Sequence, residues 1–271
     1  MNIKKWPFAA FIALFALSCG DLSEDTLLFD TMTADKTVTL SNDEGSPVCT
    51  VHLELAYATD DNGHKAEVVN NYIQQQLLNM EDIPIRHAAD SFCNAYTTNY
   101  LRNLLPLYNQ NRSDTTLRSW YEYHFTITSE AIGGCSPTDI RPATTVISAI
   151  VDYFEGGIHG VNQQLTMNFN NRTGQLIGLN DVFVPGYESQ LVAILQKALC
   201  EKVGAKNLAG LRRKGYLVGM AMYPSRNFMV NDESITFIYN PDDIAPYDKG
   251  ATELIIPLPL LKRILKPEYM P

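Results

Sequence analysis

Apolar residues recur along this chain with two different periods, and the change between them predicts where strands and helices lie. Apolar and polar side chains alternate over 38–40 and 51–55, which predicts two strands near the start of the body. Residues 64–80 and about 86–108 instead carry apolar side chains every three to four positions, as amphipathic helices do. We expect the second helix to fray near Pro106, because proline removes a backbone hydrogen bond inside a helix.

Beyond residue 116 the period returns to two, and Asn170-Asn171-Arg172-Thr173-Gly174 is typical of a hairpin turn. Strands and helices come in blocks rather than in strict alternation. The fold class we expect is therefore α+β, with mainly antiparallel sheets packed with helices in two lobes. The predicted elements of this half are strands over 117–132, 144–154, 161–169, 228–230, 234–239 and 251–256, and helices over 187–203 and 259–265.

The pattern divides the chain into four parts: a leader over 1–19, a flexible tether over 20–36, an N-terminal α+β lobe over 37–141 and a C-terminal α+β lobe over 142–271. The tether is predicted from its polar, acidic, Thr- and Asp-rich composition and its weak periodicity. Two lobes are predicted because each half carries both strands and a helical block.

The first residues have the build of an export signal. Lys4 and Lys5 precede an apolar stretch, Trp6 to Leu17, that is too short to span a bilayer. The stretch ends in Ala16-Leu17-Ser18-Cys19, which resembles the lipobox at which a cysteine is lipidated and becomes the mature N-terminus. We expect an exported protein, lipid-anchored through Cys19 in the cell envelope, in the outer membrane or at the cell surface rather than in the inner membrane. The alternative is an ordinary cleaved signal with a coincidental cysteine.

The formal net charge of −9 becomes more negative once the two lysines of the leader are removed. Nucleic acid and anionic membrane surfaces attract basic patches, so an acidic body argues against both as partners. A cationic partner suits the charge better. The membrane is expected to be reached through the lipid anchor alone.

Four cysteines remain in the body, at Cys49, Cys93, Cys135 and Cys200. An even number in an exported chain favours at least one disulfide, and three pairings are open. The alternative is that Cys93 and Cys200, on apolar helix faces, are buried thiols. No pair has the C-x-x-C spacing of a metal site, and we expect no metal and no cofactor.

Candidate site residues lie in two turns. His159 lies between glycines, where an exposed imidazole could bind a ligand or act as a base, although the turn alone explains the glycines. Asp242 and Asp243 could act as paired carboxylates, but Asn-Pro-Asp-Asp is a turn sequence, and Tyr247 ends the same loop as a packed or contacting residue. No nucleophile elbow, phosphate loop or zinc-protease helix is present, so we assign no catalytic residue.

Four segments after residue 142 follow one another in a recognisable order. They are Tyr153-Phe154-Glu155-Gly156-Gly157-Ile158-His159-Gly160, Leu179-Asn180-Asp181-Val182-Phe183, Phe237 to Tyr247 with Gly250, and Glu253-Leu254-Ile255-Ile256-Pro257. This order resembles the extracytoplasmic domain shared by the lysozyme-sensing anti-sigma factor RsiV and the peptidoglycan deacetylase PdaC, and is similar to domain-of-unknown-function lipoproteins of Bacteroidetes type. The resemblance implies an α+β body outside the cytoplasmic membrane, does not imply catalysis, and adds Tyr153 to the candidate binding residues.

Three functions are compatible with these observations. The first is a non-catalytic, lipid-anchored binding module for a lysozyme-like protein or an envelope glycan. The second is a hydrolase acting on envelope glycan, which requires a concave site where His159 meets a carboxylate from another segment. The third is a structural subunit of a surface assembly. A binding module is expected to show a broad exposed acidic or aromatic face instead.

Overall fold

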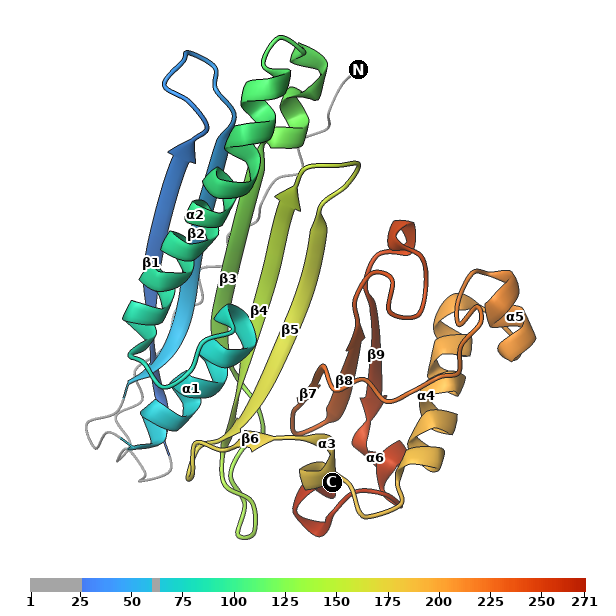
Figure 1. The fold of residues 1–271 in the computed structure, drawn as a ribbon. Helices are drawn as coiled ribbons and strands as arrows, with labels where there is room; N and C mark the ends of the chain where they lie inside the picture. Colours follow the sequence, from blue (N-terminus) through green and yellow to red (C-terminus); the bar gives the residue numbers. More distant parts are fainter. Residues whose placement is uncertain (1–25, 60–63) are drawn as a thin grey trace, which may run out of the picture.

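The computed structural model describes residues 26–59 and 64–271, and it has the expected α+β class (Figure 1). A six-stranded sheet has the order β1-β2-β3-β4-β5-β6, and a three-stranded sheet has the order β7-β8-β9. The strands are β1 (Leu28–Thr39), β2 (Val48–Thr59), β3 (Tyr123–Gly133), β4 (Thr144–Glu155), β5 (Val161–Asn170), β6 (Leu176–Ile177), β7 (Phe228–Val230), β8 (Ser234–Tyr239) and β9 (Thr252–Pro257). The helices are α1 (His64–Leu78), α2 (Ile85–Asn111), η1 (Thr115–Tyr121), α3 (Leu179–Val182), α4 (Glu188–Val203), α5 (Leu208–Arg213), η2 (Tyr247–Lys249), α6 (Leu258–Leu261) and η3 (Pro267–Tyr269).

The large sheet is antiparallel at every pairing except β2–β3, which is parallel. A parallel pair needs a long connection, and α1 and α2 provide it by crossing one face of the sheet (Figure 1). The alternation in β2 turns Cys49, Val51, Leu53 and Leu55 toward these helices, where each is at most 2% exposed. One core therefore lies between the large sheet and the two helices.

Helix α2 continues through Pro106 to Asn111, so the expected fraying near the proline is wrong. Pro106 itself is exposed, while Leu104, Leu105 and Tyr108 around it pack against the core. This packing holds the last turns together although the proline removes one backbone bond. The predicted strand over 117–132 begins later than expected, because its first residues form η1, which Asp114 caps by accepting from the Thr116 amide.

The small sheet packs against α4, which lies beyond it from the large sheet (Figure 1). Leu191, Leu195 and Leu199 recur every four residues on the inner side of α4 and are fully buried. The helix ends at Gly204, whose φ of 65° is the left-handed cap that glycine adopts without strain. A second core therefore lies between α4 and β7–β9.

Asparagine side chains join the two sheets along β5. The amide of Gln164 donates to Asn240 Oδ1 at 2.8 Å, and the amide of Thr166 donates to Asn227 Oδ1 at 2.9 Å. The buried Asn168 bonds two backbone groups on one edge of β7, donating to the Phe228 carbonyl and accepting from the Val230 amide. Side-chain amides thus take the place of a backbone ladder at this junction, which we call the asparagine seam.

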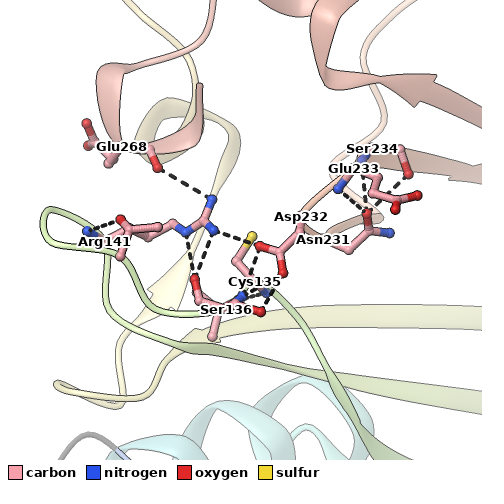
Figure 2. Close-up of polar contacts among 10 residues, drawn as sticks. Cys135, Ser136, Arg141, Asn231, Asp232, Glu233, Ser234 and Glu268 are labelled. Carbon is pink, nitrogen blue, oxygen red and sulfur yellow. Dashed lines mark hydrogen bonds and ion pairs between the residues drawn. The ribbon is translucent and has the colours of Figure 1, made fainter. Parts of the chain in front are cut away.

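An arginine buried to 6% exposure forms a second link between the sheets (Figure 2). Arg141, in the β3–β4 connection, pairs with Asp232 in the β7–β8 turn at 2.7 Å. It also donates to the carbonyls of Ser136 and Glu268, and Asp232 accepts from the amide and hydroxyl of Ser136. Three separate segments, including the C-terminal one, are held by this single guanidinium.

Two predicted boundaries are wrong. Residues 28–36, predicted as tether, lie in β1, where Met32, Ala34 and Lys36 point inward and the intervening Thr and Asp residues point outward. The inward set is only weakly apolar, which hides its period of two. The sheets also divide after β6 rather than near residue 142, because β3 and β4 are hairpin neighbours in one sheet. The expected lipidation site, Cys19, lies outside the described residues, as does the rest of the leader.

The expected disulfide is absent, and all four described cysteines are free thiols. Cys49 in β2 and Cys93 in α2 are enclosed in the first core, and Cys135 is buried in the second, with Cys200 packed against it. The alternative interpretation, thiols packed as small apolar groups, therefore holds for Cys93 and Cys200, and Cys49 and Cys135 pack in the same way. Burial raises the pKa of Cys49 to about 12 and that of Cys93 to about 11. None of the described helices is long and apolar enough to cross a bilayer.

Candidate functional site

Three loops that are distant in sequence meet at one end of the molecule. They are the β4–β5 turn (156–160), the connection from α5 to β7 (214–227) and the β8–β9 loop (240–251), which together we call the loop surface. The imidazole of His159 stacks on the ring of Tyr247, with centroids 4.3 Å apart and planes 20° apart. The amide of Leu217 donates to the carbonyl of Ile244 at 2.8 Å, which joins the second loop to the third.

His159 is exposed and held by its own turn. Gly156 and Gly157 have φ values of 77° and 101°, which glycine adopts readily. The ring nitrogen Nδ1 donates to the Gly160 carbonyl at 3.1 Å, and a carbonyl can only accept, so Nδ1 carries the proton.

Asp242 and Asp243 form a turn, as their sequence context indicates. Asp242 has a φ of 70° and donates its amide to the Ala245 carbonyl. The carboxylate of Asp243 accepts from the Asn240 amide at 2.6 Å, and Asn240 in turn anchors β5. The backbone of Asp242 and the carboxylate of Asp243 therefore shape the loop, and neither residue lines one of the three cavities described below.

The backbone of Tyr153 runs beside Gly160 of the β4–β5 turn, but its ring packs in the first core. The ring stacks on Phe125 with centroids 5.6 Å apart, on the face of the large sheet that α2 covers. Of the five candidate residues, the structure brings His159 and Tyr247 into contact, places both aspartates in the same loop as Tyr247, and packs the Tyr153 ring against the large sheet.

The loop surface also carries apolar side chains that sequence reasoning missed. Ile158 is 95% exposed and Val218 is 66% exposed, and the half-exposed ring of Tyr223 lies in the same loops. Ile158 and Val218 are each next to a glycine with positive φ, Gly157 and Gly219. An aliphatic residue beside a turn glycine is the sequence signal that could have identified both, because such turns project outward.

A smaller pocket lies next to the loop surface, between α2 and the ends of β3 and β4. Its volume is about 210 Å³, and we call it the tyrosine pocket. Its lining residues are aromatic, amide and acidic, and they are Tyr96, Asn99, Tyr100, Asn103, Leu104, Tyr123 and Glu155. Sequence reasoning missed it because its residues come from three elements whose pairing the sequence does not reveal.

A cavity of about 730 Å³ lies at the asparagine seam. Its polar lining includes Asn168, Asp181, Glu188 and Arg226. The Asp181 carboxylate already accepts from the Gly178 amide, and the Asn168 side chain already donates to the Phe228 carbonyl in the asparagine seam. A third cavity, of about 700 Å³, lies where β2, α1 and the start of α2 meet. His159 lines none of these three cavities.

Within residues 26–59 and 64–271, no three or more His, Cys, Asp and Glu side chains gather as metal ligands. The loop surface presents charges of both signs: Asp242 and Asp248 are negative, and Lys214 and Lys249 are positive. Its chemistry is that of a contact surface: a stacked aromatic pair, exposed aliphatic side chains and surrounding charges.

Comparison with known proteins finds a matching family model and similar solved structures. Residues 180–258, which include two of the three loops, match the family described as "Protein of unknown function (DUF3298)". A DUF3298 family member from Bacteroides fragilis superimposes with a TM-score of 0.78 at 23% identity, over 89% of this chain and 94% of that one. A DUF3298 family protein from Pseudomonas aeruginosa gives 0.63 at 18% identity, over 92% and 98%. These two likenesses show the fold, and no curated protein matches the chain.

Proposed function

We propose that this protein is exported, anchored in the cell envelope by lipid on Cys19, and acts as a non-catalytic module that binds a cationic protein of the lysozyme type. The loop surface is the proposed contact. The observation that carries the proposal is the stacked pair of His159 and Tyr247 beside the almost fully exposed Ile158. Tyrosine is among the residues enriched in binding hot spots, and exposed apolar side chains that gather on one surface mark interaction sites.

The geometry of His159 favours binding over hydrolysis of a glycan. A general acid or base must lie within hydrogen-bond reach of its partner groups in a concave site. The hydrogen bond found at this imidazole joins it to the Gly160 carbonyl, and its ring face is covered by Tyr247. The nearby carboxylate of Asp243 is committed to the turn.

The acidic body supports a cationic partner, because complementary charge raises the rate of encounter and disfavours acidic competitors. The resemblance to the domain of the lysozyme-sensing anti-sigma factor RsiV and of the deacetylase PdaC supports a partner of the lysozyme type. It is an analogy between folds, so the contact itself must be tested on this chain.

The binding test uses the chain from residue 20, which contains every residue that the structure describes. Calorimetry with hen-type lysozyme at low and physiological salt is expected to give saturable binding that survives physiological salt. Ile158→Ser and Tyr247→Ala are each expected to weaken it tenfold or more, or about 1.4 kcal/mol. The matched control is Leu260→Ser, a 62% exposed residue in α6 at the other end of the small sheet.

Three results would contradict the proposal. Binding that disappears at physiological salt would reflect charge attraction alone, and equal effects of Ile158→Ser and Leu260→Ser would exclude the loop surface. Binding to soluble peptidoglycan fragments in place of lysozyme would replace the protein partner by a glycan.

The anchor is tested separately on the full chain in a Gram-negative host fed an alkyne-labelled fatty acid. We expect label on the wild-type chain and in its membrane fraction, and none on Cys19→Ala. Equal labelling of the two chains, or no labelling of either, would exclude lipidation at Cys19.

A further inference from the structure

The tyrosine pocket is formed where one face of α2 crosses the ends of two strands. Residues 96, 99, 100, 103 and 104 are three or four positions apart and therefore share a face of the helix. Tyr123 begins β3 and Glu155 ends β4, and the two are paired directly across the strands. Tyr100 is 3% exposed and forms the floor, while Asn99, Asn103 and Glu155 are exposed at the rim.

Two of the three tyrosine hydroxyls in the pocket lining, those of Tyr96 and Tyr100, are already hydrogen-bonded, so these two residues offer a ligand mainly their rings. Tyr96 donates to Glu155 Oε1 at 2.7 Å, and Tyr100 donates to the Tyr121 carbonyl at 2.8 Å. The rings of Tyr100 and Tyr123 are 5.2 Å apart and tilted by 55°. Aromatic rings carry negative charge on their faces, so several rings around one space attract a cation.

Glu155 is the one charged residue in the lining, and among the described residues no Lys or Arg is paired with it. Arg102, the cation next to the rim, donates instead to Asn99 Oδ1 at 2.7 Å. Burial, and then the charge of Glu155, raise the pKa of Tyr123, which keeps its phenol neutral. The pocket therefore combines neutral rings with an uncompensated carboxylate.

We propose that the tyrosine pocket binds the ammonium group of a lysine side chain presented by the partner protein, an inference that rests on the proposed function. The ammonium donates to Glu155 and to the amide oxygen of Asn103, and the methylene stem packs against Leu104 and the Tyr123 ring. At about 210 Å³ the pocket is smaller than the roughly 300–1,000 Å³ usual for whole small-molecule ligands, which suits one side chain.

The position of Glu155 connects this pocket to the loop surface. It is the last residue of β4, four positions before His159 in the turn that follows, so the Cα atoms of the two lie at most about 14 Å apart. A folded protein that covers Ile158 and Tyr247 can therefore place a lysine in the pocket. A neutral sugar would also suit the rings and amides of the pocket. The Glu155 carboxylate, which no Lys or Arg pairs with among the described residues, favours lysine instead.

The test uses Nα-acetyl-lysine methylamide as the probe and its Nε-acetylated form as the uncharged control. Magnetic resonance of the chain from residue 20, labelled in its tyrosine rings, is expected to show saturable shifts of Tyr96 and Tyr123 with the charged probe only. Glu155→Gln keeps an acceptor for Tyr96 and is expected to weaken binding tenfold or more. Glu130→Gln, an exposed β3 carboxylate outside the lining, is the matched control and is expected to change nothing.

Tyr123→Leu is the second variant and is expected to weaken the probe while the chain keeps its unfolding midpoint within a few degrees. Equal shifts with the acetylated probe or with N-acetylglucosamine, or unchanged binding by Glu155→Gln, would overturn the assignment. If lysozyme binding depends on Ile158 but the lysine probe does not bind, the lysine assignment of the pocket is overturned and the proposed function is kept. Lysine binding without lysozyme binding would support the pocket and contradict the proposed partner.

Discussion

The guanidinium of Arg141 lies 2.7 Å from Asp232 Oδ1, and these two residues, 91 positions apart, connect the two sheets (Figure 2). The arginine is buried, whereas the side chain of the aspartate is 44% exposed. A buried guanidinium needs several acceptors, and the carbonyls of Ser136 and Glu268 provide the others. The family match covers residues 180–258, which include Asp232 but not Arg141. This link therefore joins the matched region to the large sheet.

Replacing Arg141 by Met is expected to lower the free energy of unfolding by about 2–3 kcal/mol. The variant loses the hydrogen bonds from the buried guanidinium to two carbonyls and a half-exposed carboxylate, and hydrogen bonds that involve a charged group contribute about 1.5–3 kcal/mol. Urea unfolding measures the change. Arg118→Met, which removes an exposed pair with Glu122, is the control and is expected to change it by about 0.5 kcal/mol or less. Equal effects of the two variants would contradict the role of Arg141.

The same link predicts how stability depends on pH. The hydroxyl of Ser136, then its amide and Arg141, hold the pKa of Asp232 below its ordinary value. A depressed folded-state pKa stabilises the fold above the unfolded pKa of about 3.9 and stops doing so as pH falls through the folded value. The stability difference between wild type and Asp232→Asn should therefore be largest near neutral pH and shrink below about pH 4. Parallel acid-unfolding curves would contradict this.

Asn168 should be the residue on which the asparagine seam depends most. It is 2% exposed and serves the Phe228 carbonyl and the Val230 amide together. Asn168→Leu leaves the Val230 amide without a partner, while the Phe228 carbonyl keeps its bond from the Thr166 hydroxyl, so we expect a loss of about 1–3 kcal/mol in urea unfolding. Gln163→Ala, an exposed position on the same strand, is the control. A loss below about 1 kcal/mol for Asn168→Leu would mean that water replaces the amide.

The sequence predicts most elements because their burial is regular, as in α4, where three leucines recur every four residues. It predicts only the end of β1, from the alternation over 38–40, and misses residues 28–36, whose inward set includes Lys36, because an edge strand needs few apolar side chains. The division of the sheets depends on which hairpins pair, and the β3–β4 connection at 134–143 has the composition of a domain boundary.

The candidate site was predictable to the extent that glycine and turn residues mark loops. His159 and Tyr247 were both identified, but their contact depends on two sheets meeting along the seam, which no local pattern encodes. Tyr153 is a candidate binding residue only through its place in a motif of the resembled family. The alternation of β4 puts its side chain on the sheet face that α2 covers. The tyrosine pocket combines α2, β3 and β4 and so required the parallel β2–β3 crossover to be known.

Two adjacent glycines of the β4–β5 turn should respond differently to the same substitution. Both have positive φ, but a β-carbon on Gly156 would lie 2.5 Å from the Trp120 carbonyl, while one on Gly157 meets nothing within 4 Å. Gly157→Ala should therefore cost about 1–2 kcal/mol from backbone strain alone. Gly156→Ala should cost more, because the turn must also move away from η1. The free energies of unfolding of the two variants test this, and equal values would mean that the contact relaxes freely.

The state of the cysteines predicts that the fold does not depend on oxidation. All four described thiols are free, and burial raises the pKa of Cys49, Cys93 and Cys135, so little thiolate forms at pH 8. A thiol reagent at pH 8 should modify Cys200, the least buried, within minutes in the chain from residue 20. The other three should react only at the rate of unfolding. A reductant should leave the unfolding midpoint unchanged, and a fall of several degrees, together with fewer than four reactive thiols in denaturant, would mean that a disulfide forms after all.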